Sequence, residues 1–146
     1  MKFFYTAGLI SLFLTLCHAN PNPPAFPGAE GFGKFTTGGR GGEIYHVTNL
    51  KNNGPGSFRD AVSTPNRIVV FDVGGIINIS SRIVIKKNIY VAGQTAPGGG
   101  ITIYGNGIAL NGDSGNNIIR YIRIEWERTE KQKRMHLPFL QVKTIW

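Results

Sequence analysis

Residues 67–110 read RIVVFDVGGIINISSRIVIKKNIYVAGQTAPGGGITIYGNGIAL, and this stretch decides the fold class. It consists of short runs rich in Ile and Val, most of them ended by Gly, Asn, Asp or Ser, which predicts short β-strands. Similar runs recur 20 residues apart, at 69–71 and 89–91. Short strands that recur with bends instead of reversals are typical of a parallel β-helix. A β-sandwich fits the same composition nearly as well.

Further predicted elements flank this stretch. Residues 57–62 predict the one helix, because Ser57 is a suitable N-cap and Asp60 stands three positions on, as in a capping box. Pro65 ends that helix. No segment between the strands is long enough for a crossover helix, which argues against a doubly wound α/β sheet. The predicted strands are residues 41–48, 67–73, 76–79, 82–85, 88–92, 101–104, 108–110 and 117–124.

The composition supports an all-β class. Of the 146 residues, 20 are Gly, about twice the average usage, and all but Gly8 lie between Gly28 and Gly115. These glycines have no three-residue period, which excludes collagen, and 41% apolar residues are too many for a disordered tail. The formal net charge is +8, and residues 20–124 hold 10 basic and 5 acidic side chains, a charge of +5 that mildly favours a polyanionic partner.

The first 19 residues have the pattern of a secretory signal peptide. Lys2 is followed by an apolar run over 3–17, too short for an ordinary membrane span, and Ala19 is a suitable cleavage point. We therefore expect a secreted, extracellular protein with no membrane association after cleavage. Cleavage would also remove Cys17, the only cysteine, so the mature chain would have no disulfide.

The motifs between residues 24 and 124 resemble a known family when they are taken in order. They are FPGAEGFG at 26–33, TTGGRGG at 36–42, VTNL at 47–50, GPGSFRDAV at 54–62, IVVFDVGG at 68–75, AGQTAPG at 92–98 and NIIRYIRI at 117–124. The chain looks like the N-terminal part of a secreted pectate lyase of the pectin-lyase-like superfamily. This resemblance implies a right-handed parallel β-helix whose N-terminal end is capped by the helix at 57–62.

The resemblance also implies a chemistry for the intact family member. Aspartates would hold Ca²⁺, which bridges to a uronate carboxylate and acidifies the neighbouring carbon. A basic side chain, usually Arg, would take the C5 proton, and the oxygen would leave from C4 of polygalacturonate. In the family these residues follow the strand matched by 117–124. We therefore expect no catalytic residue and no calcium site in this chain, no nucleic-acid partner, and a monomer.

The sequence departs from the family after Ile124. Residues 125–146 contain no Gly, hold both Trp residues, and include 8 charged side chains among 22. One nucleotide deleted from codons for a family-like Ile-Arg-Met-Gly-Lys-Asn-Gly yields Ile-Glu-Trp-Glu-Arg-Thr, as found at 124–129. The same shift read over 131–146 recovers Asp-Ala-Leu-Ala-Ile, which the family has at this point. We interpret 125–146 as a frameshifted tail, with a genuine divergent tail as the alternative.

The expected organisation follows from these parts. Residues 1–19 are the leader, 20–124 are the N-terminal cap and first coils, and 125–146 are the off-family tail. The chain is then a truncated, inactive lyase. One alternative is a non-catalytic β-helical carbohydrate-binding or surface module, and another is a pseudogene product.

Several other side chains are candidate site residues. The glycine-rich segment 38–42 has no P-loop Lys and no following helix, so a structural loop is favoured over a phosphate cradle. His46 has no His or Cys at ligand spacing, which favours packing over a metal role. Asp72 is interpreted as a turn or capping carboxylate, and Asp113 as a loop residue that could contact a cation.

Two further patterns concern the surface. Asn78-Ile79-Ser80 is a glycosylation sequon that applies in a eukaryotic source, although Asn78 could instead pack within a coil. Basic side chains could attract polygalacturonate, but a solvated face is the favoured interpretation. These are Arg82, Lys86, Lys87, Arg120 and Arg123.

Overall fold

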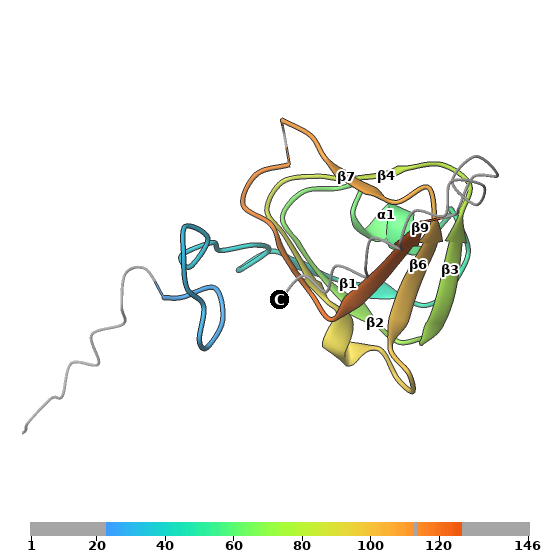
Figure 1. The fold of residues 1–146 in the computed structure, drawn as a ribbon, viewed down its shortest axis with the longest axis horizontal. Coiled ribbons are helices and arrows are strands. Elements are labelled where there is room, and N and C mark those ends of the chain that lie inside the picture. The colour runs from blue at the N-terminus through green and yellow to red at the C-terminus, as the bar shows by residue number, and fades with distance from the viewer. Residues whose placement is uncertain (1–22, 113, 127–146) are drawn as a thin grey trace, which may run out of the picture.

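The computed structural model describes residues 23–112 and 114–126, which form a coil of short strands (Figure 1). The strands are β1 (Glu43–Val47), β2 (Arg67–Phe71), β3 (Gly75–Ile79), β4 (Ile83–Ile85), β5 (Ile89–Ala92), β6 (Ile101–Gly105), β7 (Ile108–Leu110), β8 (Ile118–Arg120) and β9 (Ile122–Trp126). The helices are α1 (Phe58–Ala61) and a 3-10 turn, η1 (Gly93–Thr95).

All strand pairs among the described residues are parallel. Sheet A has the order β1-β2-β5-β8, sheet B the order β3-β6-β9, and sheet C pairs β4 with β7. The chain therefore visits sheets A, B and C in turn and returns to sheet A one level further on. This confirms the parallel β-helix and excludes the β-sandwich, whose sheets are antiparallel.

The predicted repeat is present, but it is irregular. Val69 lies beside Val91, 22 positions later, whereas Tyr90 lies beside Ile118, 28 positions later. The difference arises at the corners. Residues 93–100 join β5 to β6, whereas residues 72–74 suffice to join β2 to β3. Variable corners between strands of constant register explain why the sequence shows only a weak period.

The core consists of inward-facing Ile, Val and Phe side chains stacked from coil to coil. Helix α1 lies across the first-coil end of this core, where Phe58 is buried and stacks on Phe71 with 5.9 Å between ring centroids. Ser57 caps the helix as predicted, because its Oγ accepts the Asp60 N–H at 3.3 Å. The reciprocal half of the capping box is not formed. The Asp60 carboxylate accepts the Tyr45 hydroxyl instead.

Three asparagines form a ladder at the entrance to sheet A. Asn66, Asn88 and Asn116 precede β2, β5 and β8, and each has a left-handed φ of 56–60°. The Asn88 side-chain amide donates to Asn66 at 2.8 Å, and the Asn116 amide donates to Asn88 at 2.8 Å. Asn tolerates left-handed backbone better than most residues, so it suits this sharp corner.

Residues 23–42, here called the N-terminal strap, run outside sheet A (Figure 1). The backbone N–H of Thr37 donates to the Asn116 side chain at 2.9 Å, and Arg120 stacks over the ring of Phe26 at 4.0 Å. A Cβ on Gly39 would lie 2.0 Å from the Arg67 carbonyl oxygen. The glycines of segment 38–42 thus allow one backbone to approach another closely, as a structural loop requires.

The prediction of a single strand over 117–124 is wrong. Tyr121, with a φ of 57°, separates β8 from β9 and turns the chain from sheet A to sheet B in one residue. Gly93 lies against this corner, where a Cβ would be 2.3 Å from the Tyr121 carbonyl oxygen. Residues with high β-propensity lie on both sides of this corner, so propensity alone predicts one continuous strand. Strand β9 then runs on to Trp126, in register with β6.

Candidate functional site

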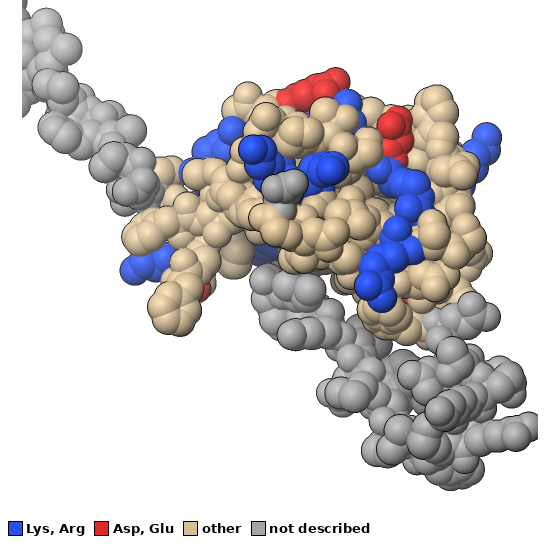
Figure 2. Space-filling model, turned by 90° about the horizontal axis from the view of Figure 1, so that it is seen from above, with Lys and Arg blue, Asp and Glu red and all other residues tan. Residues whose placement is uncertain are grey.

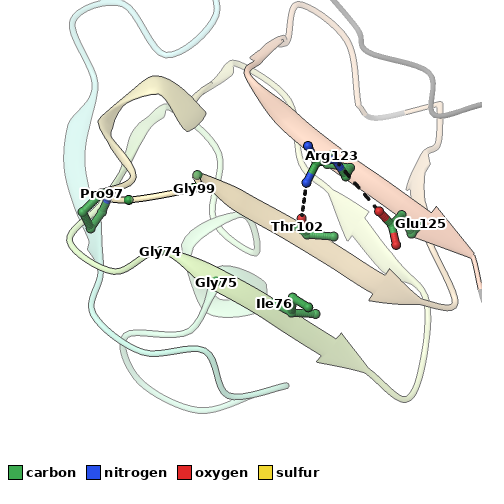
Figure 3. A pocket seen from close by; sticks show the side chains of 10 residues that line it. Gly74, Gly75, Ile76, Pro97, Gly99, Thr102, Arg123 and Glu125 are labelled. Carbon is green, nitrogen blue, oxygen red and sulfur yellow. Dashed lines mark hydrogen bonds and ion pairs between the residues drawn. The ribbon is translucent and has the colours of Figure 1, made fainter.

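An open groove of about 530 Å³ lies on the outer face of sheet B (Figure 3). The starts of β3 and β6, part of β9 and the corner between β5 and β6 contribute to it. Its lining residues are Gly74, Gly75, Ile76, Pro97, Gly98, Gly99, Gly100, Thr102, Arg123 and Glu125.

The strand register assembles the floor of the groove. Ile76, Thr102 and Arg123 are neighbours across β3, β6 and β9, and all three face outward. The Arg123 guanidinium donates to the Thr102 hydroxyl at 3.4 Å, and its Nε lies 4.0 Å from a Glu125 carboxylate oxygen. The Arg123 side chain is 54% exposed, so most of its five donors still face solvent.

The corner loop over 97–100 forms one wall. Gly98 and Gly100 have left-handed φ values of 63° and 83°, and the Gly75 N–H donates to the Gly100 carbonyl at 2.9 Å. A Cβ on Gly74 would lie 2.1 Å from the Pro97 carbonyl oxygen, so the loop packs directly on the start of β3. A guanidinium, a hydroxyl and peptide groups around an open groove suit an anionic, hydroxyl-rich ligand.

Curated relatives match most of the chain, whereas no family model does. Probable pectate lyase C of Aspergillus terreus is 58% identical over 117 residues, which are 79% of this chain and 28% of that protein. Probable pectate lyase C of Emericella nidulans is 55% identical over 115 residues, 79% of this chain and 27% of the relative. In Aspergillus fumigatus the identity is 60% over 100 residues, 68% of this chain and 24% of the relative.

This chain matches the N-terminal portion of pectate lyases. The observation confirms the family that the ordered motifs predict. The chain spans about a quarter of the length of these pectate lyases, so its similarity is to their N-terminal portion.

The five basic side chains predicted for this pectate lyase portion do not converge. Arg123 alone among them lines the groove. Arg120 stacks on Phe26 over sheet A, and Arg82 lies 5.9 Å from the Trp126 ring. Lys86 and Lys87 are exposed at the corner before β5. Lys and Arg accordingly form several separate groups on the face in Figure 2.

Sequence reasoning missed the partner of His46. Nδ1 of His46 lies 2.9 Å from a carboxylate oxygen of Asp72, and both side chains are about half exposed. The two residues are 26 positions apart and meet because β1 and β2 are parallel neighbours. Among the described residues, no three His, Cys, Asp or Glu side chains gather as a metal site would require.

Asn78 lies in the second outward row of sheet B. It is exposed on β3, beside Tyr104 of β6, which in turn lies beside Glu125 of β9. The alternative that Asn78 packs within a coil is therefore wrong.

Some predictions fall on other parts of the chain. Asp113, the predicted leader (1–19) and the tail beyond Trp126 lie outside the described residues. Within 23–112 and 114–126, no helix has the length and apolarity needed to cross a membrane.

Proposed function

We propose that this chain is the N-terminal portion of a secreted polysaccharide lyase that acts on polygalacturonate. The names of its relatives and the parallel β-helix support the lyase class. Arg123 on the groove floor, beside the Thr102 hydroxyl, is the observation that carries the substrate class. A guanidinium binds a carboxylate through two parallel hydrogen bonds, and a uronate polymer offers one carboxylate on every sugar.

The reaction proposed for the intact family member is calcium-assisted β-elimination. The described residues do not fit a calcium site, because Ca²⁺ takes six to eight oxygen ligands and Glu125 is the one carboxylate lining the groove. Glu125 also faces Arg123, which would compete with a cation for its oxygens. The calcium ligands and the catalytic base are therefore expected on later coils of the intact enzyme.

The described residues would bind and orient the polymer. Arg123 would hold a uronate carboxylate, and the Thr102 hydroxyl, in a residue only 8% exposed, would orient the guanidinium. Glu125 lies on the opposite side of the guanidinium and would limit its rotation. The contact between Arg123 and a bound carboxylate would be exposed to solvent, so binding should weaken as salt screens it.

The 146-residue chain itself should bind polygalacturonate without cleaving it. The frameshift hypothesis for 125–146 supports this proposal, since the recovered Asp-Ala-Leu-Ala-Ile would then be missing from the protein. The existence of a groove on the first coils equally favours the second candidate function, a non-catalytic acidic-polysaccharide-binding module. Resequencing the gene through codon 124 separates a frameshift from a genuine tail.

The test combines binding with cleavage. The chain should be retarded in native gels that contain polygalacturonate and should run normally in gels that contain neutral dextran. Ultraviolet absorbance from unsaturated uronate ends should stay flat, with calcium and with chelator. Cleavage by this chain would refute its inactivity.

A pair of charge-matched variants tests the groove. Arg123→Ala should lose most of the retardation, whereas Lys87→Ala, which removes the same charge at an exposed corner away from the groove, should keep it. Equal losses in both variants would show that net charge, and not the groove, retards the protein.

A further inference from the structure

The chain contains one Asn-X-Ser/Thr sequon, Asn78-Ile79-Ser80. None of its three residues lines the groove. This sequon lies at the end of β3 and alternates in burial, with Asn78 and Ser80 exposed and Ile79 buried in the core. A group attached to Asn78 would therefore leave the fold outward, and the core beneath it would be unchanged.

The side chain of Asn78 differs from the asparagines at the corners. Asn66, Asn88 and Asn116 bond one another, and Asn117 donates to two backbone carbonyls at 2.8–2.9 Å. Asn78 makes no side-chain hydrogen bond to any described residue. Asn is also depleted in strands, so β-propensity gives no reason for this residue near the end of β3.

The neighbours of Asn78 suit a sugar chain. Tyr104 is its register partner on β6 and is 37% exposed, and Ile76, two positions earlier on the same face, is 57% exposed. Adjacent strands are about 4.8 Å apart, so the first sugar on Asn78 would reach the Tyr104 ring. Aromatic rings with one wet edge pack well against surfaces that are apolar on one side and hydroxylated on the other.

We propose that Asn78 carries an N-linked glycan that lies along the outer face of sheet B against Tyr104. The attachment joins the Asn78 side-chain nitrogen to the first sugar of a lipid-linked oligosaccharide, with the lipid pyrophosphate as leaving group. The relatives named above are fungal proteins, and fungi carry out this transfer on secreted chains.

The glycan sets one border of the groove. The row of Asn78, Tyr104 and Glu125 lies directly beside the row of Ile76, Thr102 and Arg123 that forms the floor. A glycan on Asn78 would cover the second row and leave the first row open. A polymer bound at Arg123 would then run across the strands, from coil to coil, and not along them. This consequence rests on the proposed polygalacturonate binding, whereas glycan attachment rests only on the proposed secretion.

The experiment expresses the full chain with its own leader in an Aspergillus host and treats secreted and cell-associated protein with an endoglycosidase. We expect a mass loss of one glycan from the wild type. Asn78→Gln and Ser80→Ala should show no loss, whereas Ser80→Thr and the matched Asn53→Gln, a second exposed asparagine outside any sequon, should behave as the wild type. An unmodified wild type in both fractions overturns the proposal.

A second measurement tests the contact with Tyr104. Trimming the glycan should lower the midpoint of thermal unfolding by a few degrees in the wild type and by less in Tyr104→Ala. Equal shifts would overturn the contact. The polygalacturonate gel separates the two proposals, because trimmed protein that still binds at Arg123 leaves the proposed function intact whether or not Asn78 is modified.

Discussion

The outer faces of sheets A and B are built by the same coils, but the strap lies against sheet A whereas the groove on sheet B is open. The outward row of sheet A is apolar and consists of Ile44, Ile68, Tyr90 and Ile118. The strap covers the far end of this row, where Ile118 is only 7% exposed, whereas Ile44 at the near end is 60% exposed. The matching row of sheet B ends in Arg123, which stays half exposed over an open groove. The comparison teaches that outward side chains, and not the coil itself, decide which face is covered and which can bind.

The largest effect should come from placing a methyl group under the strap. Gly39→Ala puts a Cβ 2.0 Å from the Arg67 carbonyl oxygen, so the strap must lift from sheet A, and we expect a loss of about 3 kcal/mol or more. Gly99→Ala, in the groove wall of sheet B, has no atom within 4 Å and should be close to neutral. Urea unfolding measures both. Similar midpoints for the two variants would contradict the close contact of the strap.

The asparagine ladder gives the next effect. Asn88→Ala loses its bonds to Asn66 and Asn116 and forces Ala into a φ of 56°, so we expect a cost of about 2–3 kcal/mol. Asn88→Gly loses the same bonds but accepts the left-handed backbone, and it should recover about 1 kcal/mol of that cost. Thermal unfolding separates the two variants. If Gly is no better than Ala, the corner is not strained.

Tyr45 on β1 links sheet A to helix α1 through a hydrogen bond to Asp60. This bond makes the stability of the fold sensitive to pH in the alkaline range. The hydrogen bond to Asp60 raises the pKa of Tyr45 above the ordinary 10.0. The bond therefore stabilises the fold fully below about pH 10, and this contribution is lost as the pH rises through the raised pKa.

Tyr45→Phe tests this linkage. We expect it to be about 1 kcal/mol less stable than the wild type at neutral pH, with the gap narrowing above pH 10. Tyr104→Phe is the control, because it removes one phenolic hydroxyl from the outer face of sheet B. Urea unfolding at a series of pH values gives the result, and a gap that widens above pH 10 would contradict the assigned direction of the pKa.

The smallest effect on stability should come from sheet B. Arg123→Ala removes an exposed side chain with one 3.4 Å hydrogen bond and one 4.0 Å ion pair, so the free energy of unfolding should change by less than about 0.5 kcal/mol. A loss near that of Gly39→Ala would mean that the open face is as structural as the covered one.

The sequence predicts the helix and the strands better than it predicts which residues lie beside one another on adjacent strands. Ser57 and the apolar runs place α1 and most strands within two residues, because capping and β-branched patterns are local properties. The groove depends on Arg123 lying beside Thr102, 21 positions away, and that pairing follows from the parallel register. Residue propensities do not specify strand register, so the sequence alone does not predict the pair of His46 and Asp72 either.

The contact between Thr37 and Asn116 also has a consequence for the order of events during synthesis. These residues are 79 positions apart, and Thr37 leaves the ribosome first. At about 5–20 residues per second, the strap waits about 4–16 s before its last partner is made. The strap is rich in Gly and therefore has few side chains that could form other contacts during this interval. The first described segment to be synthesised is thus among the last to dock.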